Sequence, residues 1–177
     1  MRARQTLPDL WLLSDERNDA MLEDALRRLP RGSGFIFRHY HLVPEERVAR
    51  WFELLRIARA RGHVVILADN ALTAREWGAD GLYGAPRALY PTSDLLTLAT
   101  AHSLREIGLA NRARADAVLL SPVFPTRSHP DSPTLGPVRF HLLAGHAEMP
   151  VIALGGMTAR TARRLAWSRW AAINGLS

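Results

Sequence analysis

The chain has 177 residues, of which 47% are hydrophobic and 23% charged, and its formal net charge is +6. This length and balance predict one globular domain over residues 1–177, because no linker rich in Pro, Gly or Ser divides it. The absence of cysteine excludes disulfides, zinc–thiolate sites and thiol nucleophiles, and the absence of lysine excludes Schiff-base chemistry. Since no apolar run could span a bilayer and no secretory core follows the first residues, we expect a soluble, cytoplasmic protein without a membrane partner.

The positive charge also raises the question of a nucleic-acid partner. A pI near 11 would suit one, because clustered cations gain affinity by releasing counterions from phosphates. All 23 basic residues are arginines, however, and they are scattered along predicted helices with no aromatic platform between them. We therefore expect no nucleic-acid partner, and binding that weakens steeply with salt would mark the alternative.

Short β-rich apolar runs alternate with longer segments of helical periodicity, which is typical of βα units around a parallel sheet. The predicted strands are Leu10–Ser14, Phe35–Arg38, Val64–Ala68, Gly81–Tyr83, Leu98–Ala101, Ala117–Ser121, Val151–Leu154 and Ala171–Asn174. The predicted helices are Ala20–Leu29, Glu45–Arg61, Thr73–Trp77, Leu104–Arg112, Val138–His146 and Thr158–Ser168. About eight repeats predict a compact (β/α)8 barrel, with a short fourth helix or turn near Thr92–Leu96 and the last helix missing.

In the second predicted helix, one apolar stripe is expected to face the sheet. It consists of Val48, Trp51, Phe52, Leu55 and Ala58, which recur at helical spacing. We therefore predict that the aromatic side chains of this helix lie in the core.

A doubly wound open sheet would show the same alternation of strands and helices, so the barrel needs a second argument. Polar residues gather where the predicted strands end: Arg38, Asp69 with Asn70, Thr100 with His102, Thr126 with Ser128 and His129, Gly155 with Gly156, and Asn174 with Gly175. In a barrel these ends converge on one mouth, where such enzymes hold their substrates. This distribution favours the barrel.

The segment around Gly155 and Gly156 runs from a predicted buried strand into a helix that begins near Thr158. Two glycines let the backbone approach an anion closely, and the free N–H groups of the following helix attract negative charge. The loops after the seventh and eighth strands are also where such barrels often hold phosphate. We predict a phosphate site here, the alternative being a tight turn without a ligand.

The connection from Ser121 to Gly136 is longer than most strand-to-helix loops and is rich in proline and hydroxyl residues. Thr126 and Ser128 could donate hydrogen bonds to a phosphate, and Arg127 or His129 could add positive charge. We interpret the segment as a lid or binding loop, and a variable surface loop is the alternative.

Two charged residues at the strand ends each allow more than one role. Asp69 could hold Mg²⁺ together with substrate phosphates, or Asp69 and Asn70 could cap the next helix. Arg38 could point into the mouth and pair with a phosphate, or it could pair with a buried acid or lie at the surface. The remaining histidines lack metal-ligand spacing, and we expect core or surface positions for them: His39, His41, His63, His141 and His146.

Taken together, these segments resemble the thiamine phosphate synthase and thiazole tautomerase superfamily over nearly the whole chain. The most specific match is Ala115–Thr126, which reads Ala-Asp-Ala-Val-Leu-Leu-Ser-Pro-Val-Phe-Pro-Thr, followed by Pro-Val-Ile-Ala-Leu-Gly-Gly at 150–156. Gly-Ala-Asp-Gly-Leu-Tyr at 78–83 and Thr-Ala-His-Ser at 100–103 add to the resemblance.

The resemblance implies a transferase in thiamine biosynthesis that joins hydroxymethylpyrimidine diphosphate to thiazole phosphate, with Mg²⁺ as cofactor and pyrophosphate as leaving group. It implies Arg38, Thr126 and Ser128 as contacts of the diphosphate, Asp69 as metal ligand and Thr100 near the pyrimidine. The thiazole phosphate would lie at Gly155 and Gly156, and we place Asn174 and Gly175 at the same phosphate site. We expect phosphorylated small molecules as partners, and assembly into a homo-oligomer is a further possibility.

Several positions differ from the family pattern. His129 stands where the synthases have a diphosphate-binding lysine, and we count it among the candidate catalytic residues with Arg38, Thr126 and Ser128. The second strand reads Ile-Phe-Arg-His-Tyr at 36–40 without the family's Gln and Lys, and 84–88 lacks its second metal-binding Asp. Pro122 replaces the tautomerase histidine and moves no proton. The alternative hypothesis is therefore a non-catalytic phosphate-ligand-binding barrel.

Overall fold

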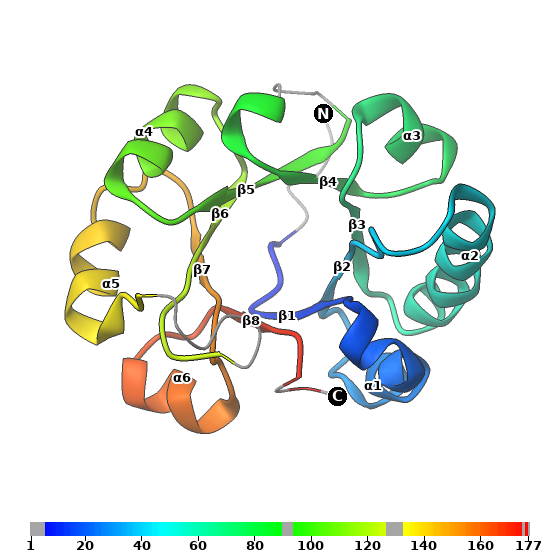
Figure 1. Ribbon diagram of the computed structural model, residues 1–177, viewed down its shortest axis with the longest axis horizontal. Coiled ribbons are helices and arrows are strands. Elements are labelled where there is room, and N and C mark those ends of the chain that lie inside the picture. Colours follow the sequence, from blue (N-terminus) through cyan, green and yellow to red (C-terminus); the bar gives the residue numbers. More distant parts are fainter. Residues whose placement is uncertain (1–5, 90–93, 127–132, 175, 177) are drawn as a thin grey trace.

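The computed structural model describes residues 6–89, 94–126, 133–174 and 176. Its strands are β1 (Leu10–Leu13), β2 (Gly34–Phe37), β3 (Val64–Leu67), β4 (Gly81–Gly84), β5 (Leu96–Ala101), β6 (Ala117–Leu120), β7 (Val151–Ala153) and β8 (Trp170–Ala172). Each strand pairs in parallel with the next, and β1 pairs with β8, so the sheet closes on itself (Figure 1). The predicted barrel is confirmed, and closure rules out the doubly wound open sheet.

The structure describes six α-helices, which surround the barrel on its outside (Figure 1). They are α1 (Leu22–Arg28), α2 (Pro44–Ala60), α3 (Ala71–Glu76), α4 (Leu104–Arg112), α5 (Gly136–Ala144) and α6 (Ala159–Leu165). Two 3-10 helices, η1 (Glu16–Met21) and η2 (Pro86–Ala88), follow β1 and β4. None of the helices in the described ranges combines the length and the apolar character that crossing a membrane requires.

The connection between β4 and β5 differs from the prediction of a short helix near Thr92–Leu96. The short helical turn comes earlier, as η2, and Leu96 already belongs to β5. The amide of Leu96 donates to the carbonyl of Asp80 at 2.9 Å, and Leu96 pairs with Gly81 on β4. Leu96 is therefore part of the sheet. Residues 92 and 93 lie outside the described part of the chain. After β8 no helix follows within the described residues 173, 174 and 176.

Alternate residues of each strand face opposite sides, and this divides the core in two. The inner cluster fills the barrel with Trp11, Leu13, Ile36, Val64, Ile66, Leu98, Ala117, Leu119, Ile152 and Ala171. The outer cluster packs strand residues such as Phe37 against helix residues such as Trp51. Because Arg38 and Thr100 come two residues after Ile36 and Leu98, the same alternation directs them toward the interior at the mouth.

The buried face of α2 overlaps with the predicted apolar stripe but is not identical to it. Trp51, Leu54 and Ala58 are fully buried, and the indole Nε1 of Trp51 donates to the carbonyl of Trp77. Phe52 is 48% exposed, so its predicted core position was wrong. Neighbouring helical residues point about 100° apart, and Phe52 lies outside the buried stripe, which consists of Trp51, Leu54, Ile57 and Ala58.

A polar network beneath the mouth joins the ends of β1 and β2 to the helix layer. The buried Ser14 hydroxyl accepts the Arg38 amide at 2.8 Å and lies 2.7 Å from Nδ1 of His39. Nε2 of His39 lies 2.7 Å from Asp19 Oδ1, to which Nε of Arg50 also donates. Since the Asp19 carboxylate can only accept, Nε2 of His39 donates to it, and in the neutral ring Nδ1 accepts the proton of the Ser14 hydroxyl. The network thereby fixes the backbone at Arg38.

This network predicts a pH dependence of stability. Burial lowers the pKa of His39 from its usual value near 6.5, against the opposing effect of Asp19; His41 and Arg50 lower it further. Between the two pKa values the unfolded chain binds more protons than the folded one, so the free energy of unfolding falls as the pH drops below about 6.5. We expect Tm, measured by circular dichroism, to decrease from about pH 7 to pH 5.

The variant His39→Gln should lower Tm at neutral pH and flatten part of this decrease. Burial also lowers the pKa of His63, so part of the decrease should remain in the variant. The exposed His146→Gln variant serves as the control for removing an imidazole. A wild-type Tm that stays constant over the whole range would contradict this account of the network.

The inner cluster predicts a steric limit at Gly34. A Cβ at this position would collide with the indole ring of the fully buried Trp11, which leaves no room to shift. We expect Gly34→Ala to lower the free energy of unfolding by about 1–3 kcal/mol, as overpacking does, measured by urea denaturation. Gly84→Ala is the matched control, because a Cβ there meets nothing within 4 Å. Equal stability of the two variants would contradict the prediction.

Candidate functional site

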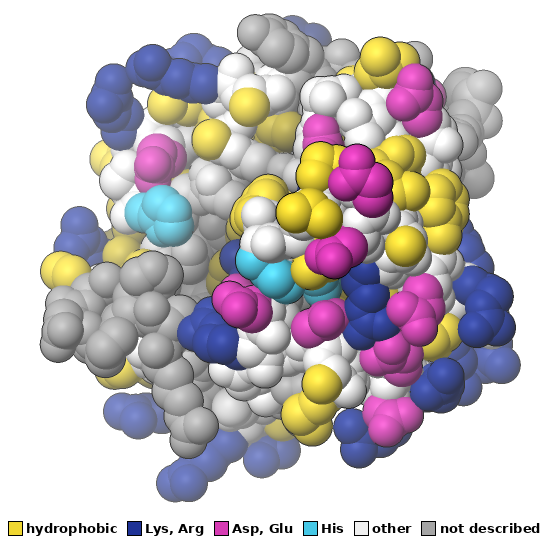
Figure 2. Space-filling view, turned by 45° about the vertical axis from the view of Figure 1, so that its right-hand side comes forward, with side chains coloured by type: hydrophobic (Ala, Val, Ile, Leu, Met, Phe, Trp, Pro, Cys, Tyr) yellow, Lys and Arg dark blue, Asp and Glu magenta, His cyan; other side chains and the backbone are white. Residues whose placement is uncertain are grey.

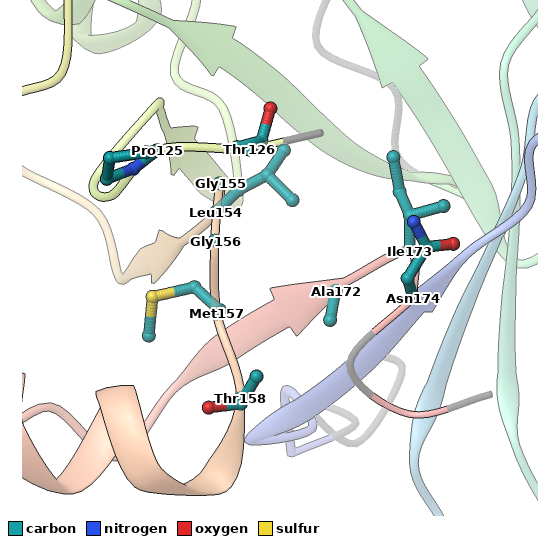
Figure 3. A pocket seen from close by; sticks show the side chains of 10 residues that line it. All are labelled: Pro125, Thr126, Leu154, Gly155, Gly156, Met157, Thr158, Ala172, Ile173 and Asn174. Atoms are coloured by element: carbon teal, nitrogen blue, oxygen red, sulfur yellow. The ribbon is translucent and has the colours of Figure 1, made fainter. Parts of the chain in front are cut away.

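A cavity of about 370 Å³ opens at the C-terminal ends of β7 and β8 (Figure 3). Its lining residues are Pro125, Thr126, Leu154, Gly155, Gly156, Met157, Thr158, Ala172, Ile173 and Asn174. The structure thus brings together four of the predicted site residues, Thr126, Gly155, Gly156 and Asn174. They come from segments after three different strands, which only the barrel places side by side.

The turn after β7 has room only for glycine at its two central positions. Gly155 and Gly156 have φ values of +95° and +63°, which residues with a side chain rarely adopt. A Cβ on Gly155 would lie 2.7 Å from Cα of Pro122, and one on Gly156 would lie 2.6 Å from the carbonyl oxygen of Pro125. The turn therefore packs directly against the backbone that follows β6.

Hydrogen bonds on this turn use its carbonyl groups and leave its amides open. The amides of Val123 and Phe124 donate to the carbonyls of Leu154 and Gly155, at 2.9 and 3.0 Å. Within the described ranges, no backbone or side-chain acceptor is paired with the N–H groups of Gly155, Gly156 and Met157. Three consecutive donors beside a cavity suit a ligand with several acceptor oxygens, such as a phosphate.

The start of α6 contributes less to this site than its sequence suggests. The amide of Thr158 donates to the Thr161 hydroxyl at 2.7 Å, and the amide of Thr161 donates to the Thr158 hydroxyl at 3.2 Å. These two groups are satisfied within the helix cap, and the cavity lining ends at Thr158, so the donors beside the cavity come from the glycine turn.

The long connection after β6 is described only at its two ends. The amides of Leu135 and Gly136 donate to the carbonyls of Pro122 and Val123, both at 2.9 Å, so the base of the loop is closed. Thr126 lines the cavity at the first end. Ser128 and His129, like Gly175 beyond β8, lie outside the described residues, and their predicted roles stay predictions.

Arg38 lies at the mouth but not in the lining of the cavity. Its Nε donates to the carbonyl of Ser14 and one terminal nitrogen donates to Asp15 Oδ2, both at 3.0 Å. Of the roles open from sequence, the structure thus shows pairing with an acid. Hydrogen bonds and charge from Arg17, with a further contribution of Arg38, hold the pKa of Asp15 below its usual range.

Asp69 also has an arginine partner. Its Oδ2 accepts a terminal nitrogen of Arg47 at 2.7 Å, and its Oδ1 accepts the backbone amide of Asn70 at 2.8 Å and the side-chain amide at 3.0 Å. The helix cap itself is Asn70, whose side chain accepts the Thr73 amide. Asp69 therefore supports the cap indirectly and faces a cation of the protein.

These contacts do not fit a Mg²⁺ site built by the protein. Mg²⁺ prefers oxygen ligands that are free to complete an octahedron, and both oxygens of Asp69 already accept hydrogen bonds. In the described part of the chain, no cluster of three His, Asp or Glu side chains could hold a metal ion. The segment 84–88 after β4 reads Gly-Ala-Pro-Arg-Ala and offers no second acid.

Two residues that the sequence analysis did not single out belong to the mouth. Tyr83 packs against the inner cluster, and burial raises the pKa of its hydroxyl, while Arg38 beside it lowers that pKa in part. From the sequence, Arg47 was only one of the arginines scattered along the predicted helices. The alternation of β4 could have found Tyr83, whereas the contact between Arg47 and Asp69 joins a helix to a strand end and leaves no local pattern.

Comparisons with known proteins agree with this architecture. The family model described as thiamine monophosphate synthase matches residues 10–176. The thiamine-phosphate synthase of Geobacillus thermodenitrificans (strain NG80-2) is 27% identical over 173 residues, covering 90% of this chain and 78% of that protein. A putative thiamine-phosphate synthase 2 of Aquifex aeolicus (strain VF5) is 26% identical over 162 residues, covering 86% and 87%.

Among solved structures, a thiamine phosphate pyrophosphorylase from Pyrococcus furiosus matches with a TM-score of 0.79 and 22% identity, covering 96% of this chain and 87% of that one. At this identity the likeness shows that the two chains share the barrel fold. The family match extends over nearly all of the chain, including the glycine turn and the segment after β6. The chain belongs to the thiamine monophosphate synthase family.

Proposed function

We propose that the chain is a transferase that joins hydroxymethylpyrimidine diphosphate to thiazole phosphate and releases pyrophosphate, forming thiamine phosphate. The observation that carries the proposal is the cavity at Gly155 and Gly156, where three consecutive amides are open to acceptors. Its size is in the range of small-molecule sites, and Thr126 and Asn174 add polar groups to its lining. Relatives named thiamine-phosphate synthase support the choice of reaction.

The reaction forms a bond between the pyrimidine methylene carbon and the thiazole nitrogen, and it breaks the bond from that carbon to the diphosphate oxygen. Negative charge then collects on the departing pyrophosphate, and fixed donors or cations must receive it. In this proposal the glycine turn orients the thiazole phosphate, while Arg38 lies at the mouth with its backbone held by Ser14. In the same proposal Thr100, on β5, contacts the pyrimidine.

The direct test is product formation. Purified protein incubated with both phosphorylated precursors and Mg²⁺ should form thiamine phosphate and pyrophosphate in equal amounts, measured by liquid chromatography and a phosphate assay. A synthase of known activity and a reaction without protein serve as controls. No product from this chain while the control synthase works would reject the transferase.

Two matched variants test the placement of the substrates. Asn174→Ala should weaken thiazole phosphate binding about tenfold in calorimetry, because it removes a polar group from the cavity lining. Thr100→Val should instead raise KM for the pyrimidine diphosphate and leave the affinity for thiazole phosphate unchanged. Unaltered thiazole phosphate affinity in Asn174→Ala would argue against this cavity as its site.

A second candidate function is phosphate-ligand binding without catalysis. The pairing of Asp69 with Arg47 favours it, since the carboxylate that the family would give to a metal is engaged by the protein. Calorimetry with thiazole phosphate and with thiamine phosphate separates the two candidates. Tight binding without turnover would support the binder, and turnover would reject it.

A further inference from the structure

We infer that Asp69 anchors Arg47 instead of holding a metal ion, and that phosphate and diphosphate ligands bind at this mouth without a divalent cation. The inference rests on the proposed function for the position of the ligand, because it concerns the same mouth. Its first half, the role of Asp69, depends only on contacts within the protein.

Arg47 is held in a single position from several sides. Besides Asp69, its guanidinium donates to the carbonyl of Ala68 at 3.0 Å and to the carbonyl of Arg38 at 3.1 Å. Its central carbon lies 5.6 Å from the ring centre of Phe37 and 5.4 Å from that of Trp77, as in cation–π contacts. The side chain is only 13% exposed. An arginine fixed in this way joins the ends of β2 and β3.

The Arg47 guanidinium also occupies the carboxylate oxygen of Asp69 that a metal ion would need. The 2.7 Å contact between Arg47 and Asp69 Oδ2 is a charge-assisted bond, and the two Asn70 donors occupy Oδ1. A Mg²⁺ ion would have to displace a cation that is held by two further carbonyl groups and two aromatic rings. Expelling it would leave a largely buried guanidinium without its counter-ion, which is strongly unfavourable.

Two acids in the connection after β1 follow the same rule. Asp15 is bound by both Arg17 and Arg38, and Asp19 is bound by Arg50. Figure 2 shows acidic and arginine side chains intermingled on this side of the molecule. The acids near the mouth are thus paired with permanent cations of the protein, since arginine keeps its charge at any working pH.

The anchoring role predicts a stability effect that is independent of metal. Asp69→Asn should lower Tm by about 5 °C or more, equally in excess EDTA and in excess MgCl2, because it breaks a largely buried ion pair. Asp24→Asn, which breaks the exposed pair with Arg27, should change Tm little. Arg47→Met should lower Tm as Asp69→Asn does, and the double variant should lose less than the sum of the two. A Tm that MgCl2 raises in the wild type but not in Asp69→Asn would overturn the inference.

The second half of the inference, ligand binding without a divalent cation, is tested by calorimetry with inorganic pyrophosphate. The wild type should bind it in excess EDTA with an affinity within about threefold of that in excess MgCl2, whereas a metal-dependent site would lose tenfold or more. Asp69→Asn should weaken binding in EDTA several-fold through the displaced Arg47, and Asp24→Asn should not. Binding only in MgCl2, or none in either buffer while thiazole phosphate still binds, would overturn this half. If thiazole phosphate also failed to bind, the proposed function would fall, while the Tm series would still decide the role of Asp69.

Discussion

Closure of the sheet between β1 and β8 is the constraint on which the rest of the structure depends. Once eight parallel strands form a ring, alternate residues must point inward, and the C-terminal ends of all strands must meet at one mouth. Trp11 and Ile36 fill the interior for this reason, and Arg38 lies above them at the mouth. Residues far apart in the chain, such as Thr126 and Asn174, share one cavity as a result of the same closure.

Backbone contact between two neighbouring connections shapes the candidate phosphate site. Gly155 and Gly156 pack so closely on the segment after β6 that no side chain fits, and hydrogen bonds from Val123 and Phe124 occupy the carbonyls of the turn. In the described ranges the amides of Gly155, Gly156 and Met157 have no protein acceptor, and all three residues line the cavity. The site is thus made by packing between two loops and depends little on the helix that follows.

Arginine side chains bind the acids near the mouth of the barrel in this chain. Arg38, Arg47 and Arg50 each tie a carboxylate at a strand end or in the adjoining helix layer, and each also donates to a backbone carbonyl. Such forked contacts need a planar group with several donors, which lysine does not offer. Fixed charges therefore hold the strand ends at the mouth, which suits the proposed reaction because its leaving group departs with negative charge.

The sequence by itself determined the barrel, the order of its elements and the glycine turn, because strand alternation, helical periodicity and paired glycines are local patterns. It predicted α4 with its observed bounds, and it missed the outward position of Phe52, since apolar character alone does not say which helix face meets the sheet. Only the tertiary structure decided that Arg38 pairs with Asp15 and that Asp69 pairs with Arg47. Those pairs join residues that are more than 20 positions apart, and no local spacing encodes which arginine a closed barrel brings to which acid.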